Sequence, residues 1–136
     1  MPSRESDERI DVAGPTAIGD AVAATRRYAL KQGLGEVDSA RLCLIVEEIV
    51  TNLCEHGVCD LDYEISVELG HRLSAIDIRI EDNGEPFDPR LASLEVGPPE
   101  RGGGAGLRLV RSWAEMIGYE SNDGRNRLQL IMPLAG

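Results

Sequence analysis

Glu48, Asn52 and His56 carry side chains capable of chemistry and follow one another at intervals of four residues. They lie in the segment "EEIVTNLCEH" (47–56), within a regular helical pattern of apolar residues. At about 100° per residue, a step of four keeps the three side chains along one margin of the apolar face. A carboxylate can move a proton, an amide oxygen can bind a metal ion, and an imidazole can do either. The alternative is that they only border a hydrophobic core; Glu47 falls on the opposite margin, in solvent.

Asp82 ends the alternating segment "SAIDIRIED" (74–82). It continues the phase of the three isoleucines before it, so we expect its carboxylate on the buried face, where it needs hydrogen-bond donors. Gly84 removes a side chain at a point that something flat could approach. The alternative is that Asp82 only caps its own turn.

A glycine cluster, "RGGGAGL" (101–107), comes just before a segment of helical periodicity. Glycines ahead of a helix leave N–H groups exposed beside the positive end of the helix dipole, which suits phosphate, although such clusters are also common in flexible loops. A Rossmann fingerprint fails at Leu107. The only lysine, Lys31, is far from any glycine-rich loop, which excludes a P-loop and a eukaryotic-type kinase fold.

Taken together, these three features predict an anionic ligand with a flat, amine-bearing part. A purine nucleotide with Mg²⁺ fits this description. Asp82 would accept the amine, the glycines would hold phosphates, and Asn52 would give the metal a hard oxygen ligand.

The elements that must position these residues can be read from periodicity. A chain of 136 residues fits one domain, 1–136, in which 1–7 are frayed and the Gly- and Pro-rich stretch 83–105 forms a lid. We expect three helices: one at 16–32, one that is capped by Asp38 or Ser39 and ended by Gly57, and one at 105–118. We expect strands at 8–12, 62–70, 74–82, 119–121 and 127–134. His71 is expected in solvent between two strands. This order predicts an α+β fold: a two-layer sandwich of a mainly antiparallel mixed sheet with three helices on one face.

Composition narrows the function further. A net charge of −10 and an aromatic content of 4% argue against binding to nucleic acid. No apolar run approaches the ~20 residues of a membrane span, and the N-terminus does not resemble a signal peptide, so we expect no membrane association and a cytoplasmic location. Cys54, His56 and Cys59 match no usual zinc spacing, and buried thiols are the better interpretation.

The segments "EEIVTNLCEHG", "EDNGEPFDP" and "GGGAGLRLV" resemble the three nucleotide-binding boxes of the gyrase and histidine-kinase type ATPase superfamily. Within it, the short chain and the first two boxes are most similar to the bacterial anti-sigma factor serine/threonine kinases. The resemblance covers nearly the whole chain and implies the Bergerat-type fold of that superfamily, ATP and Mg²⁺ as cofactors, and a homodimer.

The resemblance also implies roles for individual residues. Glu48 would be the general base that activates a serine hydroxyl, Asn52 would bind Mg²⁺, and Asp82 would bind the adenine amino group. The nucleotide-binding residues that it implies are Asn52, Asp82, Gly84, Phe87, Arg101, Gly102, Gly103, Gly104, Ala105, Gly106 and Leu107.

Some positions depart from the family pattern. Arg101 and Arg108 are both candidates for a basic residue near the lid. A threonine common near the last strand is absent, so Asn126 substitutes for it or the contact is lost. His56 matches a position that is often histidine, where a structural role is the better interpretation.

The function expected from the resemblance is an ATP-dependent protein serine/threonine kinase that acts as an anti-sigma factor. It would phosphorylate an anti-sigma antagonist and sequester a sigma factor or similar regulator. The alternatives are an ATP-binding docking module with little phosphotransfer, and a histidine-kinase catalytic domain without its dimerising helix.

Overall fold

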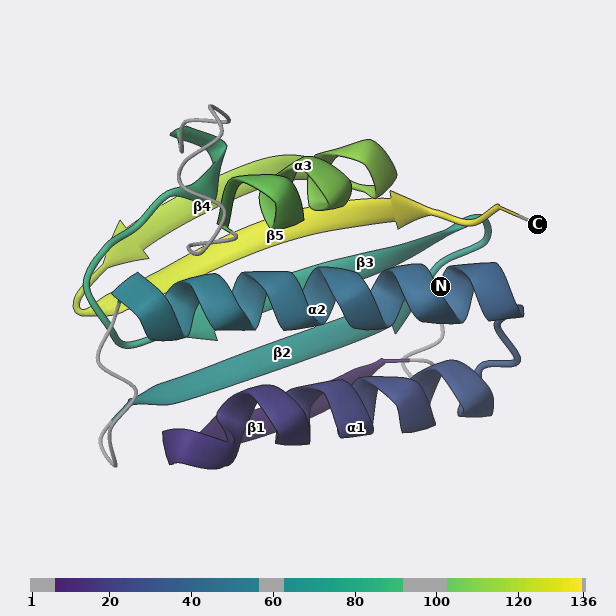
Figure 1. The fold of residues 1–136 in the computed structure, drawn as a ribbon, viewed down its shortest axis with the longest axis horizontal. Coiled ribbons are helices and arrows are strands. Elements are labelled where there is room, and N and C mark those ends of the chain that lie inside the picture. Colours follow the sequence, from purple (N-terminus) through teal and green to yellow (C-terminus); the bar gives the residue numbers. More distant parts are fainter. Residues whose placement is uncertain (1–6, 57–62, 92–102, 136) are drawn as a thin grey trace.

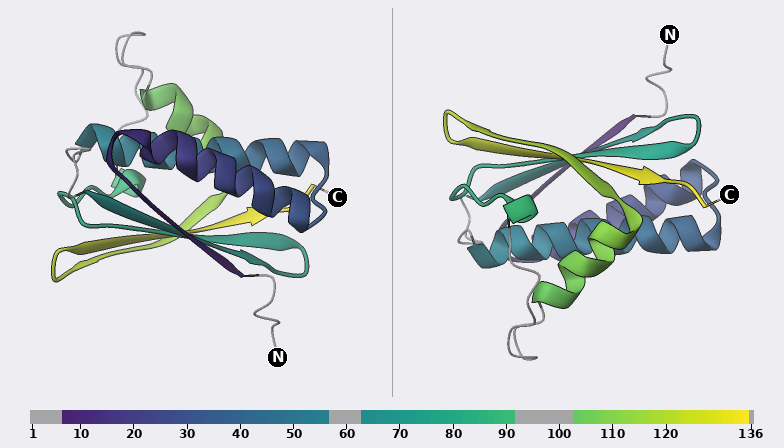
Figure 2. Two further views of the ribbon diagram at one scale, coloured as in Figure 1. Left: turned by 90° about the horizontal axis from the view of Figure 1, so that it is seen from below. Right: turned by 90° about the horizontal axis from the view of Figure 1, so that it is seen from above.

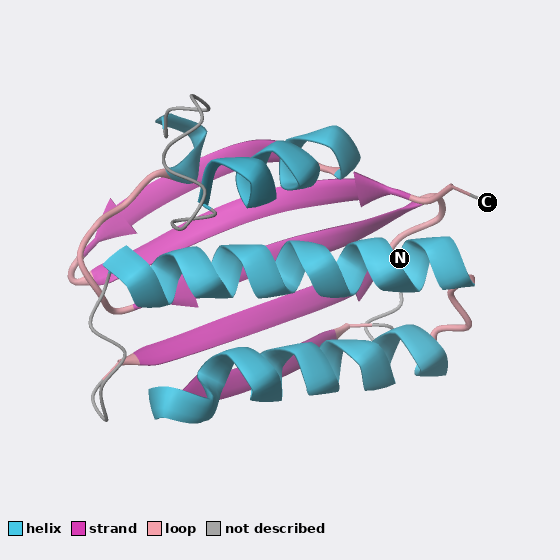
Figure 3. Ribbon diagram, in the orientation of Figure 1, coloured by secondary structure: helices cyan, strands magenta, loops and turns pink. Residues whose placement is uncertain are grey.

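The computed structural model describes residues 7–56, 63–91 and 103–135, which form two layers. Three helices cover one face of a five-stranded sheet, and no helix of the described residues lies on the other face (Figures 1 and 3). The views at right angles show the same two layers edge-on (Figure 2). None of the helices in the described part of the chain is long and apolar enough to cross a membrane.

The elements follow one another as a strand, two long helices, a hairpin, a third helix and a second hairpin. The helical elements are η2 (Gly14–Thr16), α1 (Ala17–Lys31), α2 (Glu36–His56), η3 (Pro89–Leu91) and α3 (Gly103–Trp113). The strands are β1 (Glu8–Ala13), β2 (Glu64–His71), β3 (Ala75–Asp82), β4 (Glu115–Asn122) and β5 (Arg125–Pro133). The predicted α+β two-layer fold is confirmed.

The sheet has the order β1-β2-β3-β5-β4, and each of its four pairings is antiparallel. The described strands therefore contain no parallel pair, whereas the sequence analysis had allowed a mixed sheet. β3 is the central strand. Its last residue, Asp82, lies between Ile65 of β2 and Asn126 of β5 in the register.

The core lies between the layers and has the periodicities expected from the sequence. Ile76, Ile78 and Ile80 of β3 are at most 1% exposed, and Ile45 and Ile49 of α2 are fully buried against the sheet. Burying a side chain of this size stabilises the fold by roughly 1.5–3 kcal/mol. This packing fixes the rotation of α2 about its axis and so the direction of its polar margin.

The start of α2 differs from the prediction. The helix begins at Glu36, so Asp38 lies inside its first turn and is not its cap. Asp38 is 5% exposed, and its Oδ1 accepts a hydrogen bond from the backbone N–H of Ala135 at 2.8 Å. The carboxylate thus fastens the end of the chain to the helix layer.

The end of α3 also differs from the prediction, which continued the helix to Gly118. The helix ends at Trp113, and β4 takes over from Glu115 because this segment pairs with β5 along nearly its whole length. An irregularity in the register between Met116 and Gly118 accommodates the change. Strand pairing has therefore overridden a helical pattern of apolar residues.

His71 is not a solvated turn residue. It is the last residue of β2, and its Nδ1 lies 2.9 Å from Oε1 of Gln32, the residue that ends α1. This contact joins the β2–β3 hairpin to the helix layer.

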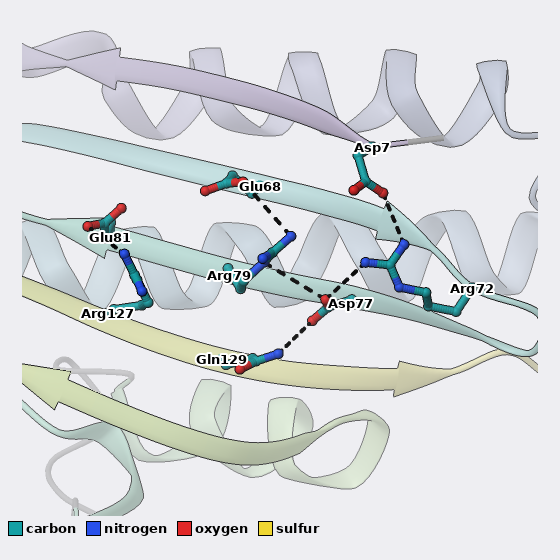
Figure 4. Close-up of polar contacts among 8 residues, drawn as sticks. All are labelled: Asp7, Glu68, Arg72, Asp77, Arg79, Glu81, Arg127 and Gln129. Carbon is teal, nitrogen blue, oxygen red and sulfur yellow. Dashed lines mark hydrogen bonds and ion pairs between the residues drawn. The ribbon is translucent and has the colours of Figure 1, made fainter. Parts of the chain in front are cut away.

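The open face of the sheet carries a network of charged side chains (Figure 4). Its centre is Asp77 of β3, which is 7% exposed. Asp77 accepts hydrogen bonds from Arg72 at 3.4 Å and Gln129 at 3.2 Å, and Arg79 lies 3.8 Å away. Arg72 also bonds to Asp7 at 3.1 Å, and so joins the start of β1 to the central strand.

Replacing Asp77 with Ala should destabilise the protein because Arg79, Arg72 and Gln129 lose their shared acceptor in a part-buried setting. We expect a loss of about 1–3 kcal/mol in the free energy of unfolding, measured by urea denaturation. Glu81→Ala is the matched control. It removes a pair with Arg127, whose side chain is 55% exposed, so its cost should stay below about 1 kcal/mol. Equal losses in the two variants would contradict a central role for Asp77.

Candidate functional site

Three segments identified in the sequence lie at one end of the molecule. The C-terminal end of α2, the end of β3 and the start of α3 are found together at the left of Figure 1. The contacts among their side chains define the candidate site.

The polar margin of α2 contributes Glu48 and Asn52. Asn52 is 5% exposed, and its Nδ2 donates to the backbone oxygen of Glu48 at 2.8 Å. This bond fixes the amide and leaves Oδ1 without a donor among the described residues. Glu47 lies on the other side of the helix, where it lines the groove between α1 and α2. The side chain of His56 lies outside the described residues.

Glu48 lies directly against the first turn of α3. A Cβ placed on Gly106 would overlap the end of the Glu48 side chain, so the present position of this carboxylate depends on glycine at position 106. Burial raises the pKa of the Glu48 carboxyl, and the negative charges of Glu47 and Glu55 raise it further. Glu48 is therefore a stronger base than an ordinary surface glutamate.

Asp82 is held by three donors that come from separate elements. It is 2% exposed, and its Oδ2 accepts hydrogen bonds from Tyr63 Oη at 3.1 Å, Gly84 N at 3.0 Å and Asn126 Nδ2 at 3.3 Å. All three bonds end on the same oxygen. Within the described part of the chain, Oδ1 has no donor and remains available to a ligand.

Gly84 lies against a buried tyrosine. The space left by its missing side chain is filled by Tyr63, because a Cβ at position 84 would come within 2.6 Å of Tyr63 Cε1. The glycine thus allows the tyrosine to reach Asp82. Asn126 also donates to the carbonyl oxygen of Gly84 at 2.9 Å, which joins β5 to the segment after β3; its substitution for the missing threonine stays a prediction.

The segment after β3 is anchored to β4 and α3. The backbone N–H of Phe87 donates to Tyr119 Oη at 3.0 Å. Arg111 of α3 donates to the carbonyl oxygens of Pro89 and Arg90, each at 2.8 Å. These bonds hold η3 beside α3. In the sequence, the two elements flank residues 92–102, which lie outside the described residues.

The glycine cluster forms the first turn of α3 and does not precede it. Gly103, Gly104 and Ala105 are helical, and N–H groups in a first turn have no acceptor within the helix. Leu107 is 3% exposed and belongs to the core. Arg101 and Gly102 lie outside the described residues.

Only part of the set considered for zinc, Cys54, His56 and Cys59, lies within the described residues. The described residues contain no group of three or more His, Cys, Asp or Glu side chains that could hold a metal ion. Cys43 is buried, and burial raises the pKa of its thiol, as expected of an inert core cysteine. Cys59 lies outside the described residues.

Sequence reasoning missed three residues of this site. Tyr63, Tyr119 and Arg111 were given no role in the sequence analysis, although Tyr63 falls within a predicted strand and lies immediately before β2 in the structure. An isolated tyrosine or arginine has no local signal, because its partner is defined only by the sheet register and the packing of α3.

A buried carboxylate with one open oxygen, an amide with an open oxygen and a glycine-rich helix start are the features from which the sequence predicts a nucleotide site. The family model for the histidine kinase-like ATPase domain matches residues 12–132. The chain therefore belongs to the histidine kinase-like ATPase domain family, for which ATP is the expected nucleotide.

The chain is also similar in sequence to proteins that are named as protein kinases. Serine/threonine-protein kinase BtrW of Bordetella bronchiseptica is 28% identical over 138 residues, covering 96% of this chain and 94% of the relative. Serine-protein kinase RsbW of Oceanobacillus iheyensis is 30% identical over 121 residues, covering 82% and 77%.

Solved structures agree on the fold. The histidine kinase domain of the Erythrobacter litoralis blue-light activated histidine kinase has a TM-score of 0.54 at 16% identity, over 88% of this chain and 60% of that chain. The catalytic domain of histidine kinase ThkA has a TM-score of 0.53 at 13% identity, over 93% and 97%.

Gly106→Ala should weaken ATP binding without weakening the fold. Alanine is the better helix former by about 1 kcal/mol, so the melting temperature should be kept or raised. The added methyl group should displace the Glu48 carboxylate into the site and lower the affinity for Mg–ATP about tenfold or more, measured by calorimetry. Gly19→Ala in α1, where a Cβ meets no atom within 4 Å, is the matched control. An unchanged ATP affinity in Gly106→Ala would count against this geometry.

Proposed function

We propose that this protein is an ATP-dependent protein serine/threonine kinase that acts as an anti-sigma factor and phosphorylates a small antagonist protein. The observation that carries the proposal is the open Oδ1 of Asp82, a buried acceptor with the right chemistry for an amine. Support also comes from the relatives, which are named serine/threonine-protein and serine-protein kinases. Partner switching between the antagonist and a sigma factor, and a homodimer, belong to the same proposal.

Adenine and phosphates would bind to different parts of the site. Asp82 Oδ1 would accept the exocyclic amine of adenine. The free N–H groups of Gly103, Gly104 and Ala105, at the positive end of α3, would receive phosphate oxygens. Because the chain has a net charge of −10, such N–H groups and a metal ion must offset its repulsion of the nucleotide.

The site has a suitable ligand for Mg²⁺ in Asn52. Its Oδ1 is a hard oxygen without a donor among the described residues, which is the kind of atom that Mg²⁺ prefers. Bound there, Mg²⁺ would neutralise charge on the phosphates.

Glu48 would act as the general base. The hydroxyl oxygen of a serine or threonine in the antagonist attacks the γ-phosphorus of ATP as the bond to the β–γ bridging oxygen breaks. The hydroxyl proton passes to Glu48, and ADP leaves with the electron pair of the broken bond. The raised pKa of the Glu48 carboxyl favours this transfer.

The direct test is incubation of the protein with labelled ATP and candidate antagonists encoded beside its gene. Label on a serine or threonine of an antagonist is the expected result. If the protein binds ATP and an antagonist but transfers no label, it is a docking module and the kinase proposal fails.

Glu48→Gln should abolish phosphotransfer while ATP still binds, because glutamine cannot accept the proton.

The pH dependence of the wild type and the stability of the variant follow from the raised pKa of Glu48. As the pH is lowered, the rate of phosphotransfer by the wild type should begin to fall at a higher pH than it would with a general base of ordinary glutamate pKa. The variant should also keep or raise the melting temperature at neutral pH. A folded-state pKa raised above the unfolded value stabilises the fold fully below the unfolded pKa, and this contribution is lost as pH rises through the folded pKa. Normal label transfer by the variant would remove Glu48 as the base.

Asn52→Ala should weaken ATP binding only when Mg²⁺ is present. We expect the affinity for Mg–ATP to fall about tenfold or more, while the affinity for ATP in excess EDTA stays within about twofold of wild type. Calorimetry in both buffers measures this difference. Thr51→Ala, one residue earlier on the helix, is the control. An equal loss in both buffers would contradict a metal ligand at Asn52.

A further inference from the structure

Tyr63 is a buried residue next to the candidate site that the proposed chemistry does not use. It is 4% exposed and lies immediately before β2. Its hydroxyl donates to Asp82 Oδ2, and its ring fills the space beside Gly84. We infer that Tyr63 is a positioning residue that sets the preference for adenine over guanine by fixing the orientation of the Asp82 carboxylate. The inference rests on the proposed function and assigns it a specificity determinant.

The orientation of a carboxylate is not fixed by its own chain. The terminal torsion of aspartate is broad and roughly two-fold, so rotation readily exchanges the two oxygens. In this protein, three donors on Oδ2 make the oxygens inequivalent. Each donor that is removed lowers the cost of rotating the carboxylate and moving Oδ1 away from the ligand.

Tyr63 is the closer of the two side-chain donors to Asp82. The Asn126 amide is shared between two acceptors, and its bond to the Gly84 carbonyl at 2.9 Å is shorter than its bond to Asp82 at 3.3 Å. A third contact holds the same amide, because Ser121 Oγ donates to Asn126 Oδ1 at 2.7 Å. The hydroxyl of Tyr63 lies closer to Asp82, at 3.1 Å.

A fixed Oδ1 discriminates between purines by their substituent at position 6. Adenine has an amine there, which donates a hydrogen bond, whereas guanine has a carbonyl oxygen, which a bare acceptor repels. A site built around a buried acceptor strongly rejects a ligand that leaves it unpaired. A carboxylate free to rotate would lose part of this selectivity.

Gly84 and Tyr63 depend on each other in this arrangement. A side chain at position 84 would overlap the tyrosine ring and also come within 3.1 Å of Asp82 Oδ2. The backbone φ angle of Gly84 is not positive, so the backbone conformation does not require glycine here. The close approach of the Tyr63 ring is the reason for a glycine at this position. Gly84→Ala should therefore displace the ring and reproduce the effect of removing the hydroxyl.

The test compares three triphosphates in wild type and Tyr63→Phe: ATP, GTP, and purine riboside triphosphate, which has no substituent at position 6. Calorimetry with Mg²⁺ should show that Tyr63→Phe weakens ATP binding about fivefold, a typical effect of one hydrogen bond. Affinity for purine riboside triphosphate should stay within about twofold, because this nucleotide offers Asp82 no amine. The ratio of ATP to GTP affinity should fall correspondingly.

Two further variants keep the test decisive. Tyr28→Phe removes the hydroxyl of another buried tyrosine, on α1, and should leave all three affinities unchanged. Gly84→Ala should give the pattern of Tyr63→Phe by an independent route, and it decides the question if Tyr63→Phe does not fold. Thermal melting reports the folding of each variant.

The outcomes separate this inference from the proposed function. If wild type does not prefer ATP over the nucleotide without an amine, the adenine assignment of Asp82 fails, and the role of Tyr63 with it. If wild type prefers ATP and Tyr63→Phe keeps the full preference, only the role of Tyr63 is overturned. Equal weakening of all three nucleotides would also overturn it, because that result indicates a structural role.

Discussion

The burial of Asp82 is the constraint on which the candidate site depends. This carboxylate ends a strand whose inward face is otherwise isoleucine, and it is only 2% exposed. Such burial is tolerated because three hydrogen bonds meet on one of its oxygens. The donors come from β5, from the segment before β2 and from the backbone after β3. The three donors therefore reach Asp82 only if the strands pair in the observed register.

The packing of α2 against α3 imposes a second close approach. Glu48 reaches the first turn of α3 only because position 106 is glycine. Burial that makes this carboxyl a better base also makes its ionised form unfavourable in the folded protein. The proposed role of Glu48 and the stability of the fold thus make opposite demands on this one residue.

Charge is distributed unequally between the two faces of the sheet. On the open face, acidic groups are neutralised within a network of arginines centred on Asp77 (Figure 4). On the helix face, Asp82 is satisfied by neutral donors, so its charge remains available to an amine. In the proposed function, a chain with a net charge of −10 would bind an anionic nucleotide through backbone N–H groups and a metal ion.

The sequence alone determined which residues share a face. Periods of 3.6 and 2 are local properties of the backbone, so the core face of α2, its polar margin and the inward direction of Asp82 were all predicted correctly, as was the family. The start of α2 and the end of α3 were misplaced: α2 begins at Glu36, before the predicted cap, and the pairing of β4 with β5 ends α3 at Trp113. Only the tertiary structure decided that Tyr63 and Asn126 meet on Asp82, and that Glu48 meets Gly106. These partners are far apart in the chain, and the register of an antiparallel sheet and the packing of two helices bring them together.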